Sequence, residues 1–544
     1  MSRASIELET VNKPEPAFTA KASQASKYTA PSIVSDHDGI PLRPLERTIT
    51  VTSNSRTAVI ITAVTLITAI STLLNGVTTV ALPTMARELS IPDALLFWPS
   101  SIQALTNGCT LLLSGTITDA LGSRFMYLVG CVLQAGFILG CGLSRNATQI
   151  IIFRGLSGVA ISLCLPSAVS IITSSFVGKR RDMAFASMGG GQPIGFSIGL
   201  VLGGVLTQTI GWRWAFHLSA LLDVLVFFIA LWGLPKEIDN PPNTDGGPAT
   251  SNWAQKLERL RTEIDWVGAV IASSSLAMLS YAMAALTGST ADIKQPATMA
   301  LLSVAIALIP GFVFWVARQE KLGNPALIPN TLWRNKVFTT ICVAVFLTWG
   351  SFNALEQILT FYFQYVQGLN PIQASIRFLP APVSGALSNI AIGLIVHRVQ
   401  ANYLVLGGCI LSIVAPLVMV AATPYSNYWA TGFLANVFNP LGADSLFTIS
   451  NLLITSVFPA KTQALAGGVF NTVSQIGKSV GLALVAVIAS SITARSPYAD
   501  KRSPEALMQG YRATFWFVFA CIFATVVICL WGLRSIGKVG HKRE

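Results

Sequence analysis

The chain has 544 residues, of which 52% are hydrophobic and only 11% are charged, and its formal net charge is +12. A soluble domain has about 25% charged residues, so this composition excludes an ordinary soluble protein and indicates one that spans a membrane. The four histidines are scattered and all eight cysteines fall in apolar stretches, so we expect no metal site, no cofactor and no disulfide framework.

Long apolar stretches recur along the whole chain, at the length of about 20 residues that a helix needs to cross a bilayer. Membrane strands need only about 10 residues of alternating pattern. The sequence therefore predicts an all-α integral membrane protein with fourteen transmembrane helices. The predicted spans are 57–83, 94–118, 125–143, 148–176, 183–208, 213–234, 265–287, 297–316, 337–366, 372–396, 402–422, 428–457, 463–492 and 511–533.

The positive charge is distributed unevenly between alternate connecting segments. The polar N-terminal segment is expected to be disordered, and most Lys and Arg residues lie in it or in loops on its side of the membrane, such as the run Lys179-Arg180-Arg181. By the positive-inside rule, both termini are predicted to be cytoplasmic. The basic charge is thereby explained by membrane topology, and no nucleic-acid partner is expected.

A short motif that recurs in degenerate form divides the chain into two parts. Gly115-x3-Asp119-x4-Arg124 follows the second span, and a degenerate copy with Gly393 and Arg398 follows the tenth. Parallel repeats of six helices build one class of transporters, so we predict two six-helix pseudo-repeats plus an inserted helix pair. The predicted parts are a cytoplasmic tail (1–56), an N-terminal half (57–234), a cytoplasmic linker (235–264), the inserted helix pair (265–316), a cytoplasmic loop (317–336), a C-terminal half (337–533) and a second cytoplasmic tail (534–544).

The fifth predicted span carries glycines at a helical spacing. Gly195, Gly199 and Gly203 recur every four residues and so lie on one helix face, with Gly204 beside them. Glycines on one face let another membrane helix approach closely. This pattern predicts a packing and hinge surface rather than a binding site.

Several short motifs resemble those of the major facilitator superfamily, in its fungal fourteen-span drug:proton antiporter branch. These motifs are Gly115…Asp119-x2-Gly122-Ser123-Arg124, Arg154-Gly155-Leu156-Ser157-Gly158, the fifth-span glycines, Trp212-Arg213-Trp214-Ala215-Phe216 and Val80-Ala81-Leu82-Pro83. The resemblance implies alternating access, with Asp119 and Arg124 making charge contacts that hold the two halves together in one access state. The chain departs from the usual pattern at Asn75, where an aspartate is usual, and at Leu200, where a proline is usual.

Ionisable residues at bilayer depth are costly and usually functional. The residues that we expect to take part in proton coupling are Glu356, Asp444, Asp223 and Arg154. Glu356 is the leading candidate because its span has a polar face; a structural hydrogen bond or a place near the outer interface is the alternative. Arginine does not release its proton in proteins, so Arg154 is expected to act on a neighbouring carboxylate or to hold an anionic group. As alternatives, Asp223 and Asp444 could form static ion pairs with basic residues, and Lys478 could balance Asp444.

Polar and aromatic residues inside the spans predict a roomy, mixed pocket for an amphipathic organic molecule. The substrate-binding candidates are Asn75, Gln103, Asn107, Gln192, Trp349, Asn353, Gln357, Phe361, Tyr362, Asn439, Asn471 and Lys478. For any one of these residues, ordinary helix packing is the alternative.

Together these features predict a monomeric transporter of the cell membrane and not an enzyme. It would export small organic compounds, such as drugs, toxins or secondary metabolites, in exchange for protons. Import, or transport of a small species such as ammonium, borate or a siderophore, is the alternative. A membrane sensor is disfavoured because the tails and the linker are too short for a signalling domain.

Overall fold

The computed structural model describes residues 54–92, 95–177, 179–235, 238, 258, 260–261, 264–288, 296–324, 327–396, 398–458 and 460–534. These residues belong to one compact unit, Thr48–Glu544. The predictions for the tail 1–56, for most of the linker 235–264 and for the end of the C-terminal tail concern residues outside this part of the chain.

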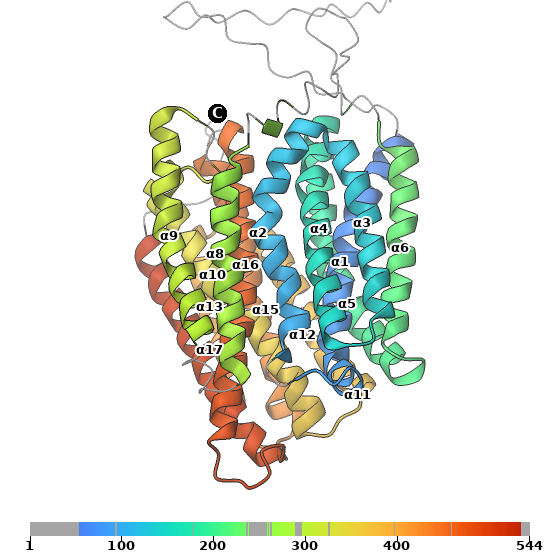
Figure 1. Ribbon diagram of the computed structural model, residues 1–544, viewed down its shortest axis with the longest axis vertical. Helices are drawn as coiled ribbons and strands as arrows, with labels where there is room; N and C mark the ends of the chain where they lie inside the picture. Colours follow the sequence, from blue (N-terminus) through green and yellow to red (C-terminus); the bar gives the residue numbers. More distant parts are fainter. Residues whose placement is uncertain are drawn as a thin grey trace, which may run out of the picture. The chain divides into compact units, whose positions relative to one another are not determined.

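The first six helices follow one another with short connections (Figure 1). They are α1 (Asn54–Glu88), α2 (Trp98–Leu121), α3 (Ser123–Leu143), α4 (Ala147–Ser175), α5 (Lys179–Thr209) and α6 (Arg213–Gly233). Gly122 joins α2 to α3 with φ of 110°, a conformation that favours glycine. Asn146 caps α4 by accepting a hydrogen bond from the backbone N–H of Gln149.

The remaining helices are more often interrupted. They are α8 (Trp266–Gly288), α9 (Pro296–Leu322), η4 (Asn330–Arg334), α10 (Lys336–Phe361), the π-helical turn η5 (Tyr362–Val366), α11 (Pro371–Phe378), α12 (Pro380–Ile395), α13 (Ala401–Ser412), α14 (Val414–Val420), η6 (Tyr428–Ala430), α15 (Gly432–Val457), α16 (Ala460–Ala494) and α17 (Pro504–Gly532). Pro380 begins α12 directly after α11 has ended, so one predicted span is made of two helices.

Every predicted span coincides with one helix or with two consecutive helices. Among the described residues, eleven helices are long and apolar enough to cross a membrane. The helices α2, α8 and α15 are not among these eleven, so the count of fourteen spans stays a prediction. Both α2 and α15 carry buried polar side chains, such as Gln103 and Asn436, which lower their hydropathy but point into the protein.

Two buried apolar clusters divide the helices into two sets. One cluster draws on α1, on α3–α6 and on their connections. The buried residues of another come from η4 and the elements after it, with Leu112 of α2 packed against them. A third cluster joins the two sets, because Val80, Phe97 and Leu200 pack with residues of α10 and η5. The contacts between the sets are made chiefly by α2 with α16 and by α5 with α11.

The fifth-span glycines lie against a neighbouring helix. A Cβ atom on Gly195 or Gly199 would collide with backbone atoms of α1, at Ala69 and Leu73 respectively. Gly203 faces Val77 of α1 in the same way, whereas Gly204 faces Ser375 of α11. The close helix approach expected from the sequence is therefore present between α5 and α1.

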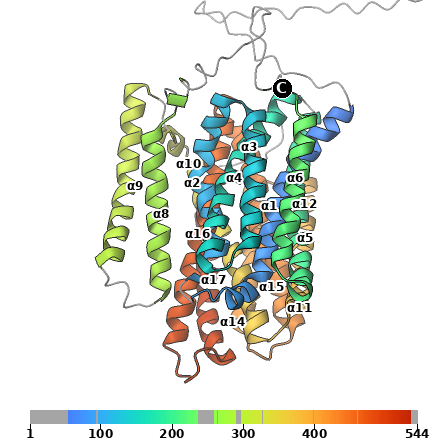
Figure 2. The same ribbon diagram turned by 45° about the vertical axis from the view of Figure 1, so that its right-hand side comes forward.

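The helices α8 and α9 pack on each other beside the other helices (Figure 2). Of the two, α8 contacts both α2 and α16, and the Ser273 hydroxyl donates a hydrogen bond to the Cys109 carbonyl of α2 over 3.1 Å. The Asp265 carboxylate holds the pair together, since it accepts hydrogen bonds from the Gly268 backbone N–H at the start of α8 and from the Trp315 indole of α9.

Candidate transport site

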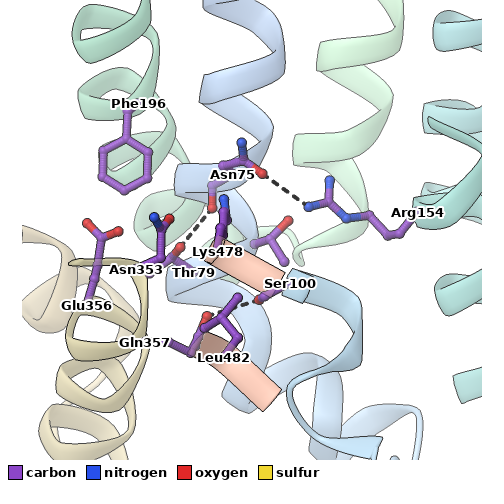
Figure 3. A pocket seen from close by; sticks show the side chains of 11 residues that line it. Asn75, Thr79, Ser100, Arg154, Phe196, Asn353, Glu356, Gln357, Lys478 and Leu482 are labelled. Atoms are coloured by element: carbon purple, nitrogen blue, oxygen red, sulfur yellow. Dashed lines mark hydrogen bonds between the residues drawn. The ribbon is translucent and has the colours of Figure 1, made fainter. Parts of the chain in front are cut away.

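A polar cavity lies where the two sets of helices meet (Figure 3). It is lined by residues from α1, α2, α4, α5, α10 and α16, namely Asn75, Thr78, Thr79, Ser100, Arg154, Phe196, Asn353, Glu356, Gln357, Lys478 and Leu482. The cavity is small, with a volume of about 20 Å³, which is room for about one water molecule. In this conformation the cavity is thus smaller than the roomy pocket expected from the sequence, because the two sets of helices are closed around it.

The structure brings several predicted site residues together at this cavity. They are Asn75, Arg154, Asn353, Glu356, Gln357 and Lys478. They come from helices far apart in the sequence, and they include a carboxylate, an ammonium group and a guanidinium group. Lys478 lines the cavity together with Glu356, whereas Asp444 does not line it.

Arg154 is held in place by two hydrogen bonds and is only 1% exposed. Its Nε donates to the Pro99 carbonyl over 3.0 Å, and its Nη2 donates to the Asn75 side-chain oxygen over 3.4 Å. Its Nη1 is buried and has no hydrogen-bond partner among the residues that the structure describes. The Asn75 amide therefore occupies the place of a counter-ion without supplying a negative charge.

Glu356 and Lys478 provide the other charges of the cavity lining. Glu356 is 6% exposed on α10, and Lys478 comes from α16. No ion pair within 4.0 Å joins them in the described structure. Because both side chains line this small cavity, the charge of each depends on what else occupies it.

Ser100 connects the two sets of helices at the edge of the cavity. Its hydroxyl donates a hydrogen bond to Gln357 Oε1 over 3.0 Å, and both residues are buried. The Gln357 amide nitrogen has no partner among the described residues. Sequence reasoning missed Ser100, because a serine in the first turn of a helix is ordinarily a capping residue.

The other missed lining residues are Thr78, Thr79, Phe196 and Leu482. Thr78 and Thr79 stand three and four positions after Asn75 and therefore share its helix face. That spacing was the available signal, but threonine in a helix commonly bonds to its own backbone. Thr79 does so here, since its hydroxyl donates to the Asn75 carbonyl over 2.9 Å.

The other two predicted proton-coupling carboxylates lie away from the cavity. Asp223 on α6 is fully buried near Tyr127 and Cys164, and neither carboxylate oxygen has a hydrogen-bond partner in the described part of the chain. Asp444 on α15 lies against Gly385 of α12. The ion pairs considered for these two residues are not found among the described residues, because the basic partners lie in other parts of the protein.

The remaining substrate-binding candidates do not line this cavity. Gln103 and Asn107 pack their backbone atoms against Gly158 of α4. The Trp349 ring stacks on Phe447 with 5.1 Å between ring centroids. The other candidates make packing or hydrogen-bonding contacts in this conformation, and they are Gln192, Phe361, Tyr362, Asn439 and Asn471.

The predicted gating loop is anchored within the first set of helices. Arg124 donates hydrogen bonds to the carbonyls of Leu231 and Leu234, at the C-terminal end of α6, over 3.0 and 2.9 Å. A guanidinium at this position satisfies carbonyls that a helix end leaves without an internal partner. Asp119 precedes this bend by about one turn and Gly115 by about two turns, near the end of α2. The expected charge contact between the two halves stays a prediction.

One end of the seam between the two sets is closed by hydrogen bonds that the sequence did not predict. The Gln364 amide donates to the Val80 carbonyl over 2.8 Å, and the Tyr365 hydroxyl donates to the Pro83 carbonyl over 3.2 Å. Nearby, Gln208 of α5 accepts a hydrogen bond from the backbone N–H at the start of α11 over 3.3 Å. The cavity is therefore separated from this end of the bundle.

Long apolar helices in two sets, with a charged cavity at their seam and one end closed, form the architecture of a membrane transporter. The model of the Major Facilitator Superfamily matches residues 64–482. The chain therefore belongs to this superfamily, whose members are transporters and not enzymes.

Related proteins carry names that indicate different functions. The chain is 39% identical to "MFS-type transporter 1" of Pyricularia oryzae over 90% of its length and 85% of that protein. It is 26% identical to the "Low affinity ammonium transporter" of Saccharomyces cerevisiae, over 73% of this chain and 74% of that one. It is 23% identical to "Efflux pump terG" of Aspergillus terreus, over 81% of this chain and 80% of that one.

A solved structure supports the fold. The bacterial homologue of the human lysosomal transporter Spinster, in an inward-facing and occupied conformation, superposes with a TM-score of 0.60. The alignment covers 89% of this chain and 98% of that chain at 14% identity. At this identity the likeness shows the fold alone.

Proposed function

We propose that this protein exports small organic compounds, such as drugs, toxins or secondary metabolites, in exchange for protons. The observation that carries the proposal is the cavity at the seam, which places the Glu356 carboxylate between two sets of helices. A carboxylate at such a position can take a proton from one side and release it to the other as access to the cavity alternates. The efflux pump among the relatives supports the direction of transport.

The proposed arrangement in the membrane follows from the charge distribution. The protein would act as a monomer in the cell membrane with both termini in the cytoplasm, and it would cross the bilayer fourteen times. The helices α1–α6 would form one half, α10–α17 the other, and α8 with α9 the inserted pair. In this orientation the closed end, at Val80 and Pro83, faces outward, so the structure represents a state that is shut to the outside.

Each charged residue of the cavity has a separate role in this proposal. Glu356 binds the transported proton, and Lys478 stabilises its carboxylate after the proton has left. Arg154 keeps its charge throughout the cycle. Asp223 and Asp444 do not line the cavity, and in this proposal the proton binds Glu356 without them.

The test is transport into everted membrane vesicles from cells that overproduce the protein. An extract of the same cells is supplied outside the vesicles, a proton gradient is imposed with the interior acidic, and the accumulated compounds are measured by mass spectrometry. We expect accumulation that a proton uncoupler abolishes and that Glu356→Gln reduces at least tenfold. The matched control is Glu505→Gln at the start of α17, which lies outside the cavity lining. Full gradient-driven accumulation by Glu356→Gln would refute the role of Glu356.

A second candidate function is import of a small cation, favoured by the ammonium transporter among the relatives. Uptake of labelled methylammonium by intact overproducing cells, compared with cells that lack the protein, tests this candidate. Faster uptake by the overproducing cells, without any vesicle accumulation of organic compounds, would replace the export proposal.

A further inference from the structure

We propose that the transported compound is amphoteric, with an acidic group that binds Arg154 and a proton-donating group, an amine or a hydroxyl, that faces Glu356. This inference rests on the proposed exchange for protons and names the substrate class of that same cavity. It is carried by the hydrogen bonds that Arg154 lacks and by the placement of charges on the two sides of the seam.

Arg154 is the first part of the argument. Its guanidinium is 1% exposed, and the hydrogen bonds recorded for it reach a backbone carbonyl and the Asn75 amide oxygen. Its Nη1 has no partner among the described residues. A guanidinium is a fork of donors that fits a carboxylate, so a carboxylate on the transported compound would supply both the missing acceptor and the missing charge.

The balance of charges points in the same direction. The described lining contains two basic side chains, Arg154 and Lys478, and one acidic side chain, Glu356. If Glu356 and Lys478 compensate each other, the charge of Arg154 is left without a counter-ion. A buried charge without a counter-ion is costly, and an anionic group on the ligand removes that cost.

A neutral hydrogen-bond donor also lines the cavity. The Gln357 amide nitrogen is buried in the same cavity and has no partner in the described structure. Its oxygen is already engaged by Ser100 over 3.0 Å, so the amide orientation leaves a donor for a ligand. Figure 3 shows Arg154 and Glu356 approaching the cavity from opposite sides, with Lys478 between them in this view.

The direction of coupling requires the second, proton-donating group. A compound with only an acidic group would bind more tightly when Glu356 is protonated, because the cavity is then more positive. Such a compound would travel together with the proton. A compound that also donates to the Glu356 carboxylate loses that interaction when Glu356 is protonated, so protons displace it, as an exchanger requires.

The first arm of the test uses the cell extract separated by ion exchange at neutral pH into anionic, cationic, zwitterionic and neutral fractions. Each fraction is offered to everted vesicles with an acidic interior. We expect the accumulated compounds to carry an acidic group together with an amine or hydroxyl. Gradient-driven accumulation of compounds without an acidic group would overturn this inference and leave the proposed exchange intact. Absence of gradient-driven accumulation from every fraction would refute the exchange itself, and this inference with it.

The second arm uses Asn75→Asp, which is nearly isosteric and places a carboxylate beside Arg154 Nη2. This internal counter-ion would compete with the acidic group of the compound. We expect wild type to prefer an accumulated compound over its methyl ester at least tenfold in kcat/KM, and the variant to lose that preference. The matched control is Asn451→Asp on α15, which adds the same charge outside the cavity lining and keeps the preference.

The outcomes of the second arm are decisive in both directions. Equal transport of acid and ester by wild type, or an unchanged preference in Asn75→Asp, would show that Arg154 has only a structural role. Folding of each variant is checked by size-exclusion chromatography and by thermal unfolding of the purified protein. Because a carboxylate beside Arg154 satisfies that arginine, the variant is expected to unfold at or above the wild-type temperature.

Discussion

At the scale of single residues, the cavity shows which ionisable side chains of the spans come together in space and which do not. Arg154, Glu356 and Lys478 lie on three helices and line one space, whereas Asp223 is enclosed within the first set of helices. A rare ionisable residue in an apolar span is therefore a good indicator of function only when its helix face is known. The sequence supplied the residue types, and the packing of the helices selected among them.

Asp223 gives a direct test of this distinction. We expect Asp223→Asn to keep gradient-driven transport within about twofold of wild type, because the side chain contacts neither the cavity nor the seam. The replacement has the same shape and removes a possible charge without opening a void. Initial rates in everted vesicles measure the effect. A loss as large as that expected for Glu356→Gln would mean that protons pass through the first set of helices.

Ser100 provides a second prediction at this scale. Ser100→Ala leaves Gln357 Oε1 buried without its donor, which costs about 1–3 kcal/mol. We expect a slower transport rate and a lower unfolding temperature. Ser101→Ala is the matched control, since the Ser101 hydroxyl bonds only within its own helix, to the Trp98 carbonyl. Equal effects of the two substitutions would show that the contact between α2 and α10 contributes no more to stability or to the transport rate than a hydrogen bond within α2.

At the scale of helices, the predicted spans match the positions of the helices, but the breaks within the helices were not predicted. All the predicted spans coincide with helices, because an apolar run of bilayer length has few other ways to satisfy its backbone. The π-helical turn η5 and the break between α13 and α14 were not predicted. The break between α13 and α14 does have a signal in the sequence, because Pro416 has no backbone N–H to donate to the Ser412 carbonyl four residues earlier. The turn η5 contains neither proline nor glycine, and its Tyr362 hydroxyl donates a hydrogen bond to the Thr423 carbonyl outside the turn.

The glycines of α5 yield a prediction for an element. Gly199→Ala would bring a Cβ atom into the backbone of Leu73 on α1, and we expect this overpacking to destabilise the protein by about 1–3 kcal/mol. Thermal unfolding of the purified variant measures the loss. Gly136→Ala on α3 is the control, because nothing lies within 4 Å of its Cβ position, and alanine there should be neutral or stabilising by up to about 1 kcal/mol. A neutral Gly199→Ala would show that α5 moves away from α1 without cost.

At the scale of the whole described unit, the hydrogen bonds from Gln364 and Tyr365 hold one end of the seam shut. A hydrogen bond contributes a net free energy of about 0.5–1.5 kcal/mol. This is small beside the cost of unfolding a helix, but it is large enough to shift the equilibrium between two conformations of the protein. The motif Val80-Ala81-Leu82-Pro83 lies at this end, but it did not predict the two bonds, because both acceptors are backbone carbonyls, at Val80 and Pro83. Contacts of this kind depend on the three-dimensional approach of helices and leave no pattern in the sequence.

Removal of one of these bonds should open that end. In a background with the half-buried Cys109 and Cys521 replaced by serine, spin labels at exposed Arg87→Cys and Gln373→Cys report the separation of α1 from α11. We expect Tyr365→Phe to raise the ratio of the longer to the shorter distance about two- to tenfold. Tyr403→Phe, at an exposed tyrosine of α13, is the control. An unchanged distance distribution would mean that the apolar contacts of the third cluster alone keep this end closed.

The position of α8 has a mechanical consequence. This helix contacts both α2 and α16, the two helices that meet across the seam, and it carries α9 with it. Any rocking of the two halves must therefore shear the surface of α8 against at least one of its neighbours. A lipid or small molecule bound beside Ser273 would hinder this movement, and it would slow the transport cycle without entering the cavity.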